Sequence, residues 1–353
     1  ITTSGSVGFG VYLYSNSNSS TLSNNTITTS GSYGYGLFLS SSSSSNISSN
    51  AITTNGLSGY GIYSRSSSNF NVVSNNTITT SNANSYGVYL DSNSDSNILS
   101  NNTIATFGSS GYGIYLASNT NNNSFSGMNV KTNNISGYAF YIYDTNHNFT
   151  IRDSILNSSS AGVQDFYVRS AVTGGTWNFT NVTRANRVPI NVFRDAGAIG
   201  TLNMMWYYQA NVTDTNNAPI IGANLSAYNK AGIPSGWQFN LTTKSSGLTN
   251  ITTITEYVDD GARNYYSLYT IKTTNRSLSE SHSLNVTERT LQAGFGGLIL
   301  DNIVFDAISP SISFVLPTPP NGFAQYDNIF VNVSASDARR GNNNISTFID
   351  FDN

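Results

Sequence analysis

Charge, cysteine and long apolar runs are scarce or missing in this chain. Charged residues make up 9% of its 353 residues, against about 25% in an ordinary soluble domain, so amide and hydroxyl groups must keep the protein in solution. The absence of cysteine excludes disulfides, thiolate metal sites and cysteine nucleophiles. No apolar stretch approaches the roughly 18 residues of a membrane-spanning helix, and no signal-peptide pattern opens the chain. We therefore expect no direct insertion into a membrane.

Basic residues are also too few for a nucleic-acid partner. The formal net charge is -3, and Arg65 and Lys131 are the only cations in the first 150 residues. A phosphate backbone would find almost nothing to neutralise there. The sequence thus argues against binding of nucleic acid.

A repeat of about 26 residues runs through the first half of the chain, with Ile-Thr-Thr recurring at Ile1, Ile27, Ile52 and Ile78. Apolar residues within a repeat lie two apart, which is typical of short strands with one buried face. A unit this small cannot bury a core alone, so the repeats must stack as coils of parallel strands. Four inward columns result, represented in one repeat by Ile78, Val88, Leu90 and Leu99, and Ser64 is their one polar exception.

Polar columns fit the same coil. Asn25, Asn50, Asn76 and Asn102 stand two residues before the next repeat begins, and they predict an amide ladder at a corner. Met128 and Ser154 occupy the next equivalent positions and should end the ladder. Glycines on both sides of an aromatic residue, as at Tyr35, indicate a sharp turn into a strand.

Runs such as Gly61-Ile62-Tyr63 and Asn75-Asn76-Thr77-Ile78 resemble the right-handed parallel β-helix repeats (PbH1 repeats) of NosD-like and pectate-lyase-like proteins. The resemblance covers about residues 1 to 170. It implies the fold and says little of function, because the same architecture serves lyases, hydrolases, tailspikes and adhesins.

The period ends near Gly174, and alternating strands with turn signals follow. The stretch 212–223 resembles carboxypeptidase-regulatory or Ig-like β-sandwich modules of prokaryotic surface proteins, archaeal rather than bacterial, and 310–337 resembles the opening of another Ig-like module. The predicted fold is all-β: a right-handed parallel β-helix of about seven coils (1–172), a boundary segment (173–200), a β-sandwich (201–307) and a partial Ig-like module (308–353). We expect the chain to be a piece of a longer protein, or a subunit whose open end a neighbour covers.

The repeat region is poor in groups that catalysis on this fold requires. Lyases need clustered carboxylates for calcium and a basic proton acceptor, and hydrolases need grouped aspartates. Asp91, Asp95 and Asp144 are the acids of residues 1–150, and we interpret the first two as solvated turn residues, with a calcium site as an alternative. His147 and His282 stand far apart in sequence, and no nucleophile motif accompanies either.

Acidic residues further along the chain are interpreted as structural. The group Arg152, Asp153, Asp165 and Arg169 is expected to form ion pairs between adjacent coils. Calcium at module junctions is an alternative for a second group of acids, Asp301, Asp306 and Asp337. The sequence therefore predicts no catalytic residue, no resident cofactor and no enzyme, with a polysaccharide lyase or hydrolase disfavoured.

One aromatic column lies between the two inward positions of its strand and should therefore point away from the core. A flat outward stripe of this kind could stabilise itself, contact another protein or bind a sugar, and these alternatives stay open. The candidate contact surface comprises Tyr12, Phe38, Tyr63, Tyr89, Tyr115, Tyr141 and Tyr167.

Asn-x-Ser/Thr sequons are frequent, which makes the chain a candidate glycoprotein if it is exported. Candidate glycosylation sites are Asn24, Asn75, Asn101, Asn148, Asn178, Asn181, Asn211, Asn224, Asn240 and Asn285.

These features together predict a non-enzymatic extracellular protein: a subunit of a cell-surface filament, S-layer or adhesin whose partners are copies of itself and, as a second class, surface glycans. A hook-bearing archaeal filament subunit of the hamus type would fit this description. The alternative is a carbohydrate-binding or carbohydrate-processing β-helix protein whose catalytic parts lie outside this chain.

Overall fold

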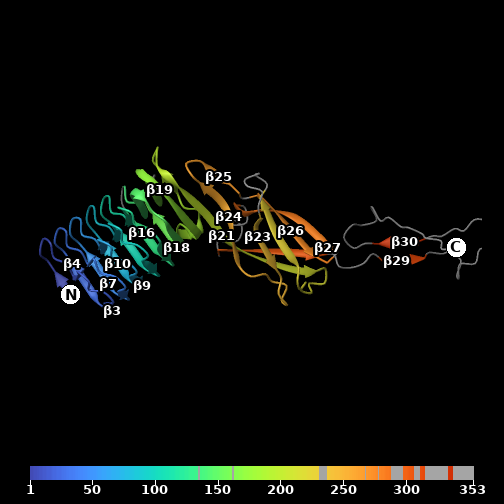
Figure 1. The fold of residues 1–353 in the computed structure, drawn as a ribbon, viewed down its shortest axis with the longest axis horizontal. Coiled ribbons are helices and arrows are strands. Elements are labelled where there is room, and N and C mark those ends of the chain that lie inside the picture. Colours follow the sequence, from blue (N-terminus) through green and yellow to red (C-terminus); the bar gives the residue numbers. More distant parts are fainter. Residues whose placement is uncertain are drawn as a thin grey trace, which may run out of the picture.

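The chain folds into a parallel β-helix followed by mostly antiparallel strands, as seen in a computed structural model (Figure 1). The structure describes residues 1–133, 136–160, 163–229, 237–266, 268–276, 278–287, 297–305, 311–314 and 333–336. Each coil contributes three short strands that pair in parallel with their copies in the next coil. Figure 1 shows the coils stacked from the blue N-terminal end to the green strands, with the yellow and orange strands beyond them.

The strands of successive coils form three ranks. The first rank contains β1 (Thr2–Thr3), β4 (Thr26–Thr29), β7 (Ala51–Thr54), β10 (Thr77–Thr80), β13 (Thr103–Thr106), β16 (Asn129–Thr132) and the second half of β18 (Phe149–Ser158). The second rank contains β2 (Val11–Tyr14), β5 (Leu37–Ser40), β8 (Ile62–Arg65), β11 (Val88–Leu90), β14 (Ile114–Leu116), β17 (Phe140–Asn146), the first part of β19 (Phe166–Thr183) and β20 (Val192–Arg194). The third rank contains β3 (Thr21–Ser23), β6 (Asn46–Ser48), β9 (Val72–Ser74), β12 (Ile98–Ser100), β15 (Asn123–Ser126), the first half of β18, the second part of β19 and the start of β21 (Ile199–Asp214).

The interior of the β-helix is filled by the predicted inward columns. Ile78, Val88, Leu90 and Leu99 of one coil are each at most 3% exposed, and the equivalent residues of neighbouring coils belong to the same cluster. Burying one such side chain contributes about 1.5–3 kcal/mol, so each coil gains most of its stability from its neighbours. Ser64 is buried in the column as predicted, with its hydroxyl 3.4 Å from the carbonyl of Ser68.

The asparagine ladder is confirmed at the corner before the first rank. The Oδ1 of Asn76 accepts hydrogen bonds from the backbone N–H (2.9 Å) and the Nδ2 (3.0 Å) of Asn50, and its own Nδ2 donates to the carbonyl of Ile47. Met128 ends the ladder as predicted, because it leaves the Asn102 Nδ2 with only a 3.8 Å sulfur contact on that side. A second ladder, through Asn71, Asn97 and Asn123, was not foreseen in the sequence.

The coils continue further along the chain than the expected limit at residue 172. Strands β2, β5, β8, β11, β14, β17, β19 and β20 make eight strands in the second rank rather than about seven, and β21 continues the third rank through Phe179↔Met204. The predicted boundary segment therefore lies largely within the stack. Register shifts between Ile142 and Asn146 change the number of residues between equivalent strands. The period of about 26 residues therefore disappears from the sequence, although the parallel strand pairing continues. The turn between β19 and β20 contains one short 3₁₀ helix, η1 (Ala185–Arg187).

The strands after residue 205 share a second core. The second half of β21 pairs with β24 (Thr252–Asp259) and β28 (Leu298–Phe305), and β24 pairs with β25 (Arg263–Tyr265). A separate antiparallel sheet has the order β23 (Trp237–Thr242), β22 (Asn224–Asn229), β26 (Leu268–Asn275), β27 (Leu278–Asn285). Tyr208 and Val212 of the first group lie in one buried cluster with Leu225 and Ile271 of the second. The described residues of the range 201–307 thus form mainly β-strands, in line with the prediction, while its assignment to an Ig-like or carboxypeptidase-regulatory module stays a prediction.

The predicted module at 308–353 lies mostly outside the described residues. Its described part is a two-stranded antiparallel ladder of β29 (Ser311–Phe314) and β30 (Val333–Ser336).

Candidate functional site

The predicted aromatic column points outward from the second rank but is mostly covered. Its members pair in register from coil to coil, as in Tyr63↔Tyr89 and Tyr89↔Tyr115. Tyr63 is 7% exposed and Tyr115 is 8% exposed, whereas Tyr12 in the first coil is 44% exposed. The expectation of a flat, open stripe is therefore wrong for the middle coils. The alternation of inward and outward residues along a strand predicts the direction of a side chain. It does not predict whether another part of the chain covers that side chain.

A second aromatic column provides the cover. It comes from the aromatic position just before each second-rank strand. Glycines flank this position on both sides in four repeats and on one side at Tyr86 and Tyr138, and the sequence had indicated it only as a turn. The column consists of Phe9, Tyr35, Tyr60, Tyr86, Tyr112 and Tyr138. We call this set the outer column, the predicted set the inner column, and both together the aromatic face.

Rings stack at most steps within each column. Between the columns they meet edge to face in the earlier coils, as at Tyr60–Tyr63, and lie stacked in the later ones, as at Tyr138–Tyr141. Tyr60 and Tyr86 of the outer column have ring centroids 4.8 Å apart and an interplanar angle of 6°. Tyr60 meets Tyr63 of the inner column at 5.4 Å and 77°. Both geometries are favourable for aromatic pairs.

The buried phenol groups in the middle of the aromatic face stay protonated. Burial, followed by neighbouring tyrosines, raises the pKa of Tyr112 to about 12, and burial raises the pKa of Tyr86 in the same direction. A protonated phenol both donates and accepts hydrogen bonds. The face therefore combines an apolar body with a regular row of polar groups.

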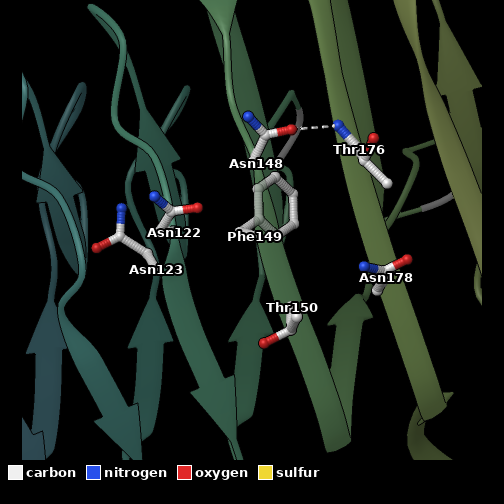
Figure 2. A pocket seen from close by; sticks show the side chains of 7 residues that line it. All are labelled: Asn122, Asn123, Asn148, Phe149, Thr150, Thr176 and Asn178. Carbon is white, nitrogen blue, oxygen red and sulfur yellow. Dashed lines mark hydrogen bonds between the residues drawn. The ribbon is translucent and has the colours of Figure 1, made fainter.

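A separate hollow of about 260 Å³ opens beside β15, β18 and β19 (Figure 2). Its lining consists mainly of amide and hydroxyl side chains around the edge of one ring: Asn122, Asn123, Asn148, Phe149, Thr150, Thr176 and Asn178. Asn148 is held in place, since its Oδ1 accepts a 2.9 Å hydrogen bond from the Thr176 N–H. Asn122 is exposed to solvent, and its backbone adopts the left-handed conformation. Neutral amides of this kind suit a ligand rich in hydroxyl groups.

The predicted glycosylation sites fall into two groups. An exposed group comprises Asn24, Asn75, Asn101, Asn148, Asn224 and Asn240. A partly buried group comprises Asn178, Asn181, Asn211 and Asn285. In the sequons at Asn24, Asn75 and Asn101 the middle residue is a ladder asparagine, so the first and third residues both face away from the core. Glycosylation stays a prediction at all ten positions.

The acidic residues form structural contacts. The buried carboxylate of Asp165 pairs with Arg184 at 3.1 Å and accepts a hydrogen bond from the Ser158 N–H. The predicted pairing of Asp165 with Arg152 or Arg169 is therefore wrong, because Arg184 reaches it from the next coil. Asp153 accepts from the Tyr207 hydroxyl and Arg169 lies 4.2 Å from the centre of the Tyr143 ring.

Among the described residues, no group of three or more histidines and acids lies together. Asp301 is buried and accepts hydrogen bonds from Tyr208 and the His282 ring. Asp306 and Asp337, the other residues of the calcium alternative, lie outside the described residues. Over the same described part, no helix is long and apolar enough to cross a membrane.

His147 is buried at the β17–β18 corner and should make stability depend on pH. Its Nδ1 lies 3.0 Å from the Thr120 hydroxyl, and burial lowers the pKa of the ring from 6.5 although Asp144 and Asp95 act in the opposite direction. Below pH 6.5 the unfolded chain takes up a proton that the folded ring resists. We therefore expect the free energy of unfolding to decrease as the pH is lowered below 6.5. The His147 ring should account for up to about 1.4 kcal/mol of this decrease per pH unit.

Urea unfolding at pH 7.5 and pH 5 would measure the effect. In His147→Gln the loss between the two pH values should be smaller than in the wild type. Equal losses in the two proteins would contradict the assignment.

Residues 9–177 match the family model described as right handed beta helix region. No curated protein matched the chain significantly. Among solved structures, a tailspike protein mutant of E. coli bacteriophage HK620 in complex with a hexasaccharide is 8% identical, with a TM-score of 0.26; the match covers 79% of this chain and 66% of the tailspike. The family match agrees with the strand register described above, and the N-terminal part of this chain is a right-handed parallel β-helix of the PbH1-like repeat kind.

Proposed function

We propose that this chain is a non-enzymatic structural protein of the cell surface, a subunit of a filament, S-layer or adhesin, that associates with copies of itself through the aromatic face. The observation that carries the proposal is the double tyrosine column on the outside of the β-helix. Tyrosine is favoured at protein interfaces because its ring gives a large contact area at a low cost in side-chain entropy. Filament geometry, archaeal origin, extracellular location and Ig-like spacers are parts of the same proposal.

The low charge of the chain supports self-association. With a net charge of -3 over 353 residues, copies of the chain repel one another weakly. Arg65 and Asp91 lie beside Tyr63 on the aromatic face, with the arginine 5.8 Å from the ring centre and the carboxylate 3.1 Å from the hydroxyl. Because this part of the aromatic face carries one positive and one negative charge, it can complement the same surface on a second copy of the chain.

A charge placed on the aromatic face should prevent assembly. We expect the wild type to form filaments or sheets under the electron microscope and Tyr86→Lys to form none, because an ammonium group would have to be buried in the contact. Ile98→Lys is the matched control, since it adds the same charge in the same coil at a residue that is 48% exposed on the third rank. Both variants should keep the wild-type β-sheet spectrum. Equal assembly of Tyr86→Lys and the wild type would refute the aromatic face as the contact.

The second candidate function is carbohydrate binding, which the amide-lined hollow at Asn122 and Asn178 favours. Asn122 is exposed there, and the Asn178 Oδ1 is already occupied by the Asn203 Nδ2 at 2.7 Å. Glycan-array binding by an unassembled wild type, with release of reducing ends from a bound polysaccharide, would support this alternative over the structural role.

A further inference from the structure

Two tyrosines of the inner column donate hydrogen bonds to carboxylates of the following coil. The Tyr63 hydroxyl donates to Asp91 Oδ2 at 3.1 Å, and the Tyr167 hydroxyl donates to Asp195. A phenol loses an electron readily only when its proton can leave at the same time, because the neutral radical is far more stable than the radical cation. A hydrogen-bonded carboxylate provides that proton acceptor.

A continuous row of oxidisable rings in contact joins these two positions, with three stacked steps and one, Tyr89–Tyr115, tilted at 57°. Centroid distances along the inner column are 4.7 Å for Tyr63–Tyr89, 4.7 Å for Tyr89–Tyr115, 5.2 Å for Tyr115–Tyr141 and 5.4 Å for Tyr141–Tyr167. Four coil steps separate the ends, which at about 4.8 Å a step is roughly 19 Å. Beyond the stack the column continues with Phe38 and Phe193, whose rings have no hydroxyl.

The environment favours oxidation with proton transfer over ionisation of the phenol. Burial, together with the Asp91 charge, raises the pKa of Tyr63, and burial with the Asp195 hydrogen bond raises that of Tyr167. Both phenols are therefore neutral over the physiological range. The middle rings, such as Tyr115 at 8% exposure, are shielded from direct reaction with solutes.

We propose that the aromatic face accepts single oxidising equivalents from a one-electron oxidant and relays them along the inner column between Tyr63 and Tyr167. In the first step one electron passes from Tyr63 to the oxidant and its proton passes to Asp91, which leaves a neutral tyrosyl radical. In the second step an electron returns to Tyr63 from Tyr167 through the contacting rings of the inner column. The Tyr167 proton passes to Asp195, and Asp91 returns its proton to Tyr63, so the radical has moved along the column without loss of atoms. This activity requires no assembly and is independent of the self-association proposed above.

The absence of cysteine allows a direct test. Ser67→Cys, at an exposed corner after β8, gives one thiol for attachment of a ruthenium tris-bipyridine photosensitiser near Tyr63. A laser flash with a soluble electron acceptor makes the ruthenium(III) oxidant, and transient absorption and electron paramagnetic resonance follow the tyrosyl radical. We expect a long-lived radical in this protein. The lifetime should shorten about tenfold in Tyr167→Phe and in the triple variant Tyr89→Phe, Tyr115→Phe and Tyr141→Phe.

Conservative controls separate the relay from packing. The phenylalanine variants keep the stacked rings, and Asp91→Asn keeps a hydrogen-bond acceptor but removes the base, so it should slow radical formation while leaving the β-sheet spectrum intact. Tyr265→Phe, at an exposed ring outside the aromatic face, should behave as the parent protein. Equal radical lifetimes in the parent, Tyr167→Phe and triple variants would overturn the relay, whatever the state of assembly.

Discussion

Replacing Asn76 by alanine is expected to lower the free energy of unfolding by about 3 kcal/mol or more. The side chain accepts hydrogen bonds from the N–H and Nδ2 of Asn50 and donates to the carbonyl of Ile47 and to Asn102 Oδ1. Asn76 itself is 1% exposed, so water cannot replace these partners freely. Each buried polar group that is left unpaired costs about 1–3 kcal/mol, and the ladder would be interrupted in the middle of the stack.

Urea unfolding followed by circular dichroism measures the loss. Asn55→Ala is the matched control, because Asn55 is an exposed asparagine of the same repeat as Asn76 and its removal should change the midpoint little. Similar midpoints for Asn76→Ala and Asn55→Ala would show that the ladder contributes little to stability.

Gly87→Ala is expected to destabilise the stack by about 3 kcal/mol, the upper end of the range for an overpacked core. A Cβ on Gly87 would lie 2.2 Å from Ile104 Cγ2 and 2.6 Å from the carbonyl oxygen of Gly113 in the next coil. One obstacle is backbone, so a rotamer change cannot relieve it. The glycine column ends at Ala139, whose equivalent neighbour is Leu156, a residue without a branch at Cβ.

Thermal unfolding of Gly87→Ala and Gly5→Ala gives a clean comparison. Gly5 has no atom within 4 Å of an added Cβ, so alanine there should be tolerated or slightly stabilising. If both variants unfolded at the wild-type temperature, the result would contradict a close approach of neighbouring coils at Gly87.

Much of the β-helix follows from the sequence because its register repeats. Ile78 and Val88 could be placed inward, and Asn76 in a ladder, since each occurs at the same place in several repeats. The last coil could not be predicted because its strands are longer and their register shifts after Ile142, so pairing continues where the period has stopped. The partner of Asp165 was missed for the same reason: Arg184 belongs to a coil that the period did not reveal.

The sequence predicted the direction in which the side chains of the candidate site point, but not how deeply they are buried. The alternation around Tyr63 and Tyr115 placed the inner column outside the core, yet nothing in a single strand says that Tyr60 and Tyr112 lie over it. The signal was present, because an aromatic residue recurs between glycines in most repeats. Interpreting those glycines only as turn residues hid the second column. The hydrogen bonds of Tyr63 and Tyr167 to carboxylates depend on corner conformations that only the structure gives.

Sedimentation velocity of the purified chain over a wide concentration range is the most direct test of the central claim, that this is a self-associating structural β-helix. We predict species that are heavier than the monomer and become more abundant with concentration. They should be retained in Ile98→Lys and lost in Tyr86→Lys. A wild type that sediments as a single monomer at every concentration would contradict the claim.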